Sequence, residues 1–71
     1  MRRDIAEKIA ALMVEMGAKL NQSTADVQSA ATTEEFRAYR SVVARIMGEM
    51  LTEIMNPIYR EHPDLKPPGL E

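Results

Sequence analysis

Two stretches of the chain, residues 5–20 and 36–58, carry apolar side chains at helical spacing. The first contains Ile5, Ile9, Leu12, Met16 and Leu20, and the second contains Phe36, Tyr39, Val43, Met47, Met50, Ile54 and Ile58. Steps of three and four residues place each set on one face of a helix. Because an apolar helix face must be covered by a partner, we expect an all-α protein built on a hairpin of two amphipathic helices.

The length of the chain limits how well such a hairpin covers itself. The chain has 71 residues, and a domain near this size buries only about 60% of the surface that its unfolded form exposes. It has no cysteine, so neither disulfides nor zinc bound by thiolates can support the fold. Oligomerisation is the remaining common support, and we therefore expect two hairpins to pair as a homodimeric four-helix bundle.

The expected core and dimer interface combine the two apolar faces. They consist of Leu12, Met16, Phe36, Tyr39, Val43, Met47, Met50 and Ile54. Met50 lies near the centre of the second face, so we expect it to be buried both by its own hairpin and by the partner. The many methionines indicate ordinary core packing or, alternatively, an adaptable groove for a partner helix. Gly17 and Gly48 are explained most simply by close approach of helices.

The first helix should begin near Arg3 or Asp4 and end near Asn21. Residues 21–33 are rich in Asn, Ser, Thr and Asp, which compete for backbone hydrogen bonds and favour caps and turns. A short helical turn at residues 25–30 is one reading of this segment. The alternative is that the first helix continues, because Thr24 and Val27 extend its apolar face.

The second helix has the clearest start signal. Thr32 followed by Glu35 fits a capping box, while Asn56-Pro57 predicts an end or kink, since the residue before a proline avoids the α region. Asn56 then caps a short helix that ends near Glu61. We therefore expect a helical domain over residues 1–61 and a proline-rich, extended or mobile tail over residues 62–71.

Three arginines of the second helix are candidates for an anion or an acidic partner: Arg37, Arg40 and Arg45. Arg40 lies within the apolar arc, where its stem can pack at the edge of the core while its guanidinium reaches water. The alternative is a buried arginine bonded to a carboxylate or an anion. His62 is expected to be a solvated histidine of the tail rather than a metal ligand.

Several function classes lack support in the sequence. With nine basic and eleven acidic residues, the chain lacks the basic footprint of a nucleic-acid-binding domain. Its longest apolar run, residues 10–14, is far short of a membrane span, and no signal-peptide pattern follows Met1, so a cytoplasmic location is the default. No phosphate loop, nucleophile set or metal-ligand spacing is present. We therefore expect a non-enzymatic protein without a cofactor.

One resemblance covers roughly the second half of the chain. Residues 34–40 (Glu-Glu-Phe-Arg-Ala-Tyr-Arg), 48–50 (Gly-Glu-Met) and 56–63 (Asn-Pro-Ile-Tyr-Arg-Glu-His-Pro) resemble those of a family of short uncharacterised bacterial proteins. The resemblance implies a bacterial source and brings no activity, cofactor or site residue with it.

Three functional hypotheses follow from these observations. The first is a small helical interaction module that associates with itself. The second is an antitoxin-like or other regulatory protein whose C-terminal tail binds a partner protein. The third is a binder of anions or small metabolites that uses Arg40 and Tyr39.

Overall fold

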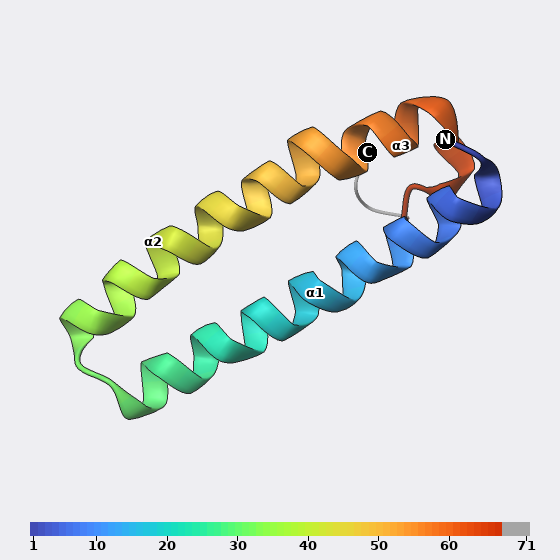
Figure 1. Cartoon of the computed structure of the whole chain (residues 1–71). Helices are drawn as coiled ribbons and strands as arrows, with labels where there is room; N and C mark the ends of the chain where they lie inside the picture. Colours follow the sequence, from blue (N-terminus) through green and yellow to red (C-terminus); the bar gives the residue numbers. More distant parts are fainter. Residues whose placement is uncertain (68–71) are drawn as a thin grey trace.

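The computed structural model describes residues 1–67, in which every regular element is helical. Helices α1 (Arg3–Ala30) and α2 (Thr33–Glu49) run antiparallel and are joined by two residues (Figure 1). The chain then passes through a π-helix, η1 (Met50–Met55), into α3 (Asn56–Glu61) and ends in a 3-10 turn, η2 (Pro63–Leu65). The predicted all-α hairpin is confirmed; its pairing with a second copy stays a prediction.

Helix α1 is one continuous element of 28 residues, so the predicted break near Asn21 is wrong. The polar side chains expected to break it bond to the helix's own backbone instead. The hydroxyls of Ser23 and Thr24 both donate to the carbonyl of Leu20, at 2.7 and 3.0 Å. Such back-bonding satisfies these hydroxyls without a turn. The alternative that extends the first helix is the correct one.

Helix α2 begins at the predicted capping box. The Glu35 amide donates to the Thr32 hydroxyl at 3.1 Å, and the Thr32 amide donates to the Glu35 carboxylate at 3.0 Å. These two bonds satisfy donors that a helix start leaves free. The bond from the Thr32 amide also lowers the pKa of the Glu35 carboxyl, because it favours the ionised form.

Of the end or kink predicted at Asn56-Pro57, the end is wrong, because the chain stays helical there. Asn56 has helical dihedral angles and makes no side-chain cap, and its amide donates to the carbonyl of Leu51, five residues back. Pro57 has no amide hydrogen, and its ring crowds the carbonyl four residues earlier. The wider π turn directly before it absorbs this conflict. The predicted short helix to Glu61 is confirmed, as a continuation of the same rod.

The seam between α1 and α2 is built from one face of each helix. Met13 from α1, Val43 from α2 and Met50, the first residue of η1, are buried along it. A Cβ atom on Gly17 would lie 3.8 Å from the end of the Met47 side chain, so the helices approach closely there. A Cβ on Gly48 would meet nothing within 4 Å. Close approach at Gly48 within the single chain is therefore wrong.

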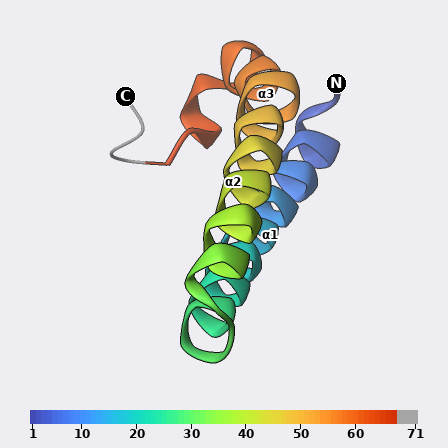
Figure 2. The same ribbon diagram turned by 90° about the vertical axis from the view of Figure 1, so that its left-hand side faces the viewer.

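The end of the hairpin where α1 begins and α3 ends is the best-packed region. Ala6 from α1 is fully buried against Ile58 and Tyr59 of α3. Leu65 packs onto this cluster from the 3-10 turn, and in Figure 2 residues 62–67 lie to one side of the helix pair. Residues 63–65 of the expected tail therefore form a packed turn rather than an extended segment, and residues 68–71 lie outside the described part of the chain.

Candidate self-association surface

The structure divides the predicted interface residues into two groups. Val43 and Met50 are buried in the seam, and Phe36, Tyr39 and Met47 are half-buried there. Leu12, Met16 and Ile54 are exposed, with Leu12 at 44%. The buried and half-buried residues hold the two helices of one hairpin together. The exposed residues lie on its surface. The edges of the expected apolar faces therefore lie outside the contact between α1 and α2.

Met50 is only 8% exposed within the single chain. The single hairpin by itself therefore already covers most of the Met50 side chain. The expectation that a partner also covers Met50 stays a prediction. Because so little of this side chain is open, Met50 belongs to the core of the hairpin rather than to its surface.

One polar contact closes the seam near the loop. The Ser23 and Tyr39 hydroxyls lie 2.7 Å apart and share a hydrogen bond. Ser23 was expected in a break between helices, so the sequence analysis missed this pair. Its signal was available in the helical spacing of Leu20, Ser23 and Val27, with a small polar residue on an otherwise apolar face. The bond holds the Tyr39 hydroxyl against α1.

One broad face of the hairpin carries a shallow apolar hollow, which we call the methionine groove. It has a volume of about 340 Å³, and its lining is Met13, Val14, Gly17, Ala18, Asn21, Met47, Met50 and Met55. Small residues on α1 leave room for the long, adaptable methionine side chains around them. The predicted alternative of a methionine-lined groove therefore has a physical counterpart here.

The other broad face carries four exposed residues that we call the aliphatic face: Leu12, Met16, Val42 and Ile46. An α-helix turns about 100° per residue, so Leu12 and Met16 lie about 160° round α1 from Val14 in the groove. On α2, Val42 and Ile46 lie about 140° and 100° from Met47. The aliphatic face is thus on the side opposite the methionine groove.

Sequence analysis missed Val42 because it lies outside the arc centred on Val43. Its signal is the spacing of four to Ile46, which forms a second apolar ridge on α2. The same spacing joins Leu12 to Met16 on α1. Two short ridges, one from each helix, therefore make up the aliphatic face.

The three candidate arginines do not form one site. Arg37 and Arg40 border a hollow on α2 together with Ser41 and Ala44, and Arg45 is not among its lining residues. All three arginines are exposed. The exposure of Arg40 agrees with a stem at the edge of the core and a guanidinium in water, and no carboxylate partner of Arg40 is seen among the described residues.

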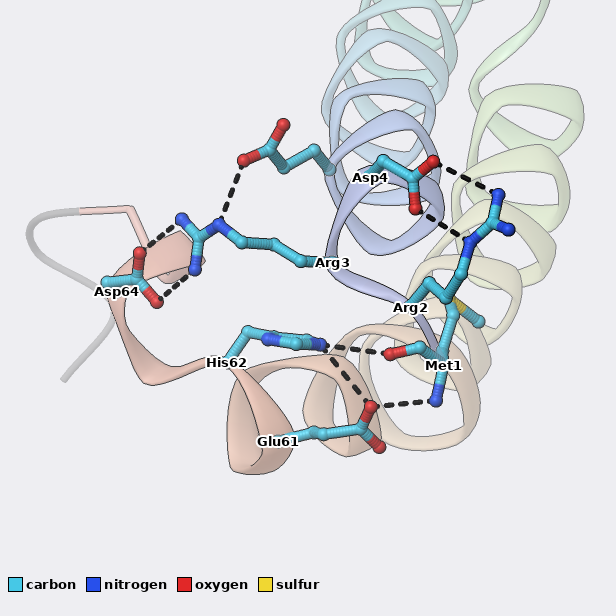
Figure 3. A network of polar contacts seen from close by, with 8 residues as sticks. Met1, Arg2, Arg3, Asp4, Glu61, His62 and Asp64 are labelled. Atoms are coloured by element: carbon cyan, nitrogen blue, oxygen red, sulfur yellow. Dashed lines mark hydrogen bonds and ion pairs between the residues drawn. The ribbon is translucent and has the colours of Figure 1, made fainter.

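A polar network ties the two ends of the described chain together (Figure 3). The Met1 ammonium donates to the Glu61 carboxylate at 2.7 Å, and the Arg3 guanidinium forms a two-bond pair with Asp64. These cations favour the ionised carboxylates, so the pKa values of Glu61 and Asp64 both lie below their ordinary values. The pKa of Arg3 is raised by the same pair.

His62 was expected to be a solvated histidine of the tail. It belongs to this network instead. Its side chain is 17% exposed, and its Nε2 atom lies 3.1 Å from the Met1 carbonyl oxygen and 3.3 Å from the Glu61 carboxylate. Within residues 1–67, no three His, Cys, Asp or Glu side chains gather as a metal site would require. The network joins residues 1–3 to residues 61–64.

Comparison with protein-family models, curated proteins and solved structures finds no match to this chain. In the part of the chain that the structure describes, no helix combines the length and the apolar character needed to cross a membrane. Any functional conclusion therefore rests on the geometry of the hairpin, and its most informative feature is the exposed aliphatic face.

Proposed function

We propose that this chain is a small non-enzymatic interaction module that associates with itself, two hairpins pairing as a four-helix bundle. The observation that carries the proposal is the amount of surface that one hairpin leaves open. Its accessible surface is 5268 Å², whereas a compact monomer of 8.0 kDa exposes about 4,450 Å² by the usual scaling with mass.

The excess of roughly 800 Å² corresponds to the area that each partner contributes to a standard protein interface. The shape of the hairpin gives the same answer. Its radius of gyration is 14.3 Å, compared with about 11 Å for a compact chain of this length and about 14.5 Å for one of twice the length. A second hairpin laid on the broad face would thicken the shortest dimension, which is 16 Å.

The chemistry of the open surface also supports association. Its large exposed apolar side chains are Met1, Leu12, Val14, Met16, Val42, Ile46, Leu51 and Ile54. Single exposed apolar residues are ordinary, but runs of them on both helices of a thin layer mark an interaction surface. The net charge of −2 is small enough that repulsion between two copies is weak.

Sedimentation equilibrium between low-micromolar and millimolar concentration tests the proposal. We expect a mass of about 16 kDa, twice the 8.0 kDa of the chain, with dissociation on dilution accompanied by loss of helical circular dichroism. A folded species that stays at 8 kDa over the whole range would overturn the proposal.

A second candidate function, anion binding, is favoured by the hollow that Arg37 and Arg40 share. Two guanidinium groups on adjacent turns suit a phosphate group. Titration with inorganic phosphate, followed by NMR of the arginine side chains, tests it. Shifts at Arg37 and Arg40 that are absent at Arg45 support binding, and equal or no shifts would remove this candidate.

The tail-binding alternative has less to support it. Leu65 packs on the core cluster, and Asp64 is held by Arg3, so a partner would first have to displace these contacts. Comparing the full chain with an Arg3→Ala variant tests this, because release of the segment should strengthen any capture by the tail.

A further inference from the structure

Each residue of the aliphatic face is followed, three positions later, by a charged residue. Glu15 follows Leu12, Lys19 follows Met16, Arg45 follows Val42 and Glu49 follows Ile46. Three residues turn a helix by about 300°, which places each charge about 60° round from its aliphatic neighbour, on the outer side. All four charged side chains are exposed. The aliphatic face therefore has a charged rim along both long edges, as protein interfaces commonly do.

These charges lie at two levels along the hairpin. A Cβ atom on Gly17 would lie 3.8 Å from the end of the Met47 side chain, and the Ser23–Tyr39 hydrogen bond gives nearly the same alignment of the two helices, so Gly17 lies about level with Met47. Since antiparallel helices advance by equal steps, Glu15 lies level with Glu49, and Lys19 lies level with Arg45. The rim thus has an acidic level and a basic level, separated by one helical turn of about 6 Å, with the Gly17 level midway between them.

Two hairpins stacked face to face by a two-fold axis can keep their helices aligned in two ways. If the axis runs along the helices, α1 lies on the partner's α2, and each level of one hairpin faces the same level of the partner. Glu15 then faces the partner's Glu49, and Lys19 faces the partner's Arg45. If the axis runs across the helices at the level of Gly17, α1 lies on the partner's α1 and the two levels exchange. Glu15 then faces the partner's Lys19, and Arg45 faces the partner's Glu49.

We propose that a second copy of this chain seats on the aliphatic face in the crosswise arrangement, with each helix antiparallel to its own counterpart. The proposal rests on self-association as the proposed function and adds the face, the direction and the pairing of the helices. Charge complementarity selects this arrangement, because opposite charges across an interface fix its register and like charges disfavour the other one. The methionine groove remains on the outside of the bundle.

Single cysteines test the pairing, and the chain offers a clean background because it has no cysteine of its own. Met16→Cys and Ile46→Cys proteins are mixed at equal concentration and oxidised gently, and the linked products are identified by mass. The crosswise arrangement predicts links between two copies of the same variant, because α1 lies on α1 and α2 lies on α2. The lengthwise arrangement predicts links between the two different variants.

Val14→Cys is the control, since Val14 is more exposed than Met16 (53% against 39%) but lies on the face with the groove. We expect it to stay unlinked under conditions that link most of the Met16→Cys protein. Predominantly mixed links, or linking through Val14, would overturn the proposed arrangement while leaving self-association intact. A chain that is monomeric at every concentration would instead overturn the proposed function itself.

Exchange of charges provides a second measurement with opposite signs for the two arrangements. Glu15→Lys should weaken the homodimer by roughly threefold to thirtyfold, since two symmetric contacts of the strength of exposed ion pairs become repulsive. Glu15→Lys and Lys19→Glu both also break the ion pair between Glu15 and Lys19 within α1, so comparing the two homodimers with their heterodimer isolates the contacts between copies. Mixing Glu15→Lys with Lys19→Glu should produce mainly heterodimer, because both contacts are then attractive. A Glu15→Lys homodimer tighter than the parent would indicate the lengthwise arrangement, in which the new lysine faces Glu49.

Discussion

One end of the hairpin, where α1 begins and α3 ends, differs from its middle in how many segments meet there. At that end, α1, α3 and the 3-10 turn enclose Ala6 and Ile58, which are 0% and 4% exposed. In the middle, only α1 and α2 meet, and Ile46 remains 42% exposed. The same residue type is thus core in one region and surface in the other.

Whether an apolar side chain is buried depends more on how many segments surround it than on the apolar pattern of its own helix. Two helices in contact can cover only one stripe each, whereas a third segment covers the flanks as well. The middle of the hairpin lacks that third segment within its own chain. A partner copy is the natural way to supply it. Changes at the enclosed end should therefore affect the stability of the single chain, and changes in the middle should affect its association.

The largest effect should come from shortening the isoleucine of the enclosed end. Ile58→Ala removes buried methyl groups next to Ala6 and Tyr59, which typically costs about 2–5 kcal/mol of unfolding free energy. Urea unfolding followed by circular dichroism measures it. The loss should be similar at low and high protein concentration. A loss below about 1 kcal/mol would show that this cluster is not a core.

Ile46→Ala is the matched change in the middle. It exposes no new cavity in the single chain, and alanine favours a helix by a few tenths of a kcal/mol, so the dissociated hairpin should be nearly unaffected. Two symmetric copies of Ile46 should, however, be lost from the dimer, raising its dissociation constant roughly tenfold or more. Sedimentation measures this constant. An unchanged constant would place the aliphatic face outside the interface.

Loss of the cap at the loop end should have an intermediate effect. Thr32→Ala removes the hydroxyl that accepts the Glu35 amide, and such a change costs about 1 kcal/mol of unfolding free energy. Thr32→Ser is the control, because serine keeps the hydroxyl and should stay close to the parent. Urea midpoints of the three proteins check this, and equal midpoints for alanine and serine would show that the box contributes no stability.

The polar network of the terminal end should make stability depend weakly on pH. Asp64 and Glu61 have lowered pKa values in the folded chain, so the folded state binds these protons less readily than the unfolded state does. Their stabilising effect is complete above the ordinary carboxyl pKa of about 4 and is lost as the pH falls through the lower folded values.

Urea midpoints between pH 7 and pH 3 measure this dependence. Asp64→Asn, which cannot ionise, should flatten the acid part of the curve compared with the parent. Parallel curves for the two proteins would mean that Arg3 and Asp64 are not paired in solution.

The smallest change is expected at the Tyr59 hydroxyl. It is buried and has no hydrogen-bond partner within residues 1–67. A buried polar group without a partner costs free energy, so Tyr59→Phe should leave the unfolding free energy unchanged or raise it by about 1 kcal/mol. Thermal melting measures it. A clear loss of stability would show that this hydroxyl is bonded in solution.

The sequence by itself determined the class of fold and the start of α2. The spacing of apolar residues and the Thr32–Glu35 box are local signals, and local signals act over one or two helical turns. It did not predict the length of α1, because Ser23 and Thr24 are equally able to cap a turn or to bond back to Leu20. The contact of Ser23 with Tyr39, sixteen residues away, exists only once α2 folds back onto α1.

Only the tertiary structure decided which edge of each apolar stripe stays open. Val43 and Ile46 are both apolar and only three residues apart, yet one is buried and the other is exposed. The difference lies in where the axis of α1 crosses the surface of α2, and no periodicity within one helix contains that information. The same holds for Leu65 and Asp64, which reach α1 only because the chain leaves the helix at His62 and turns after α3.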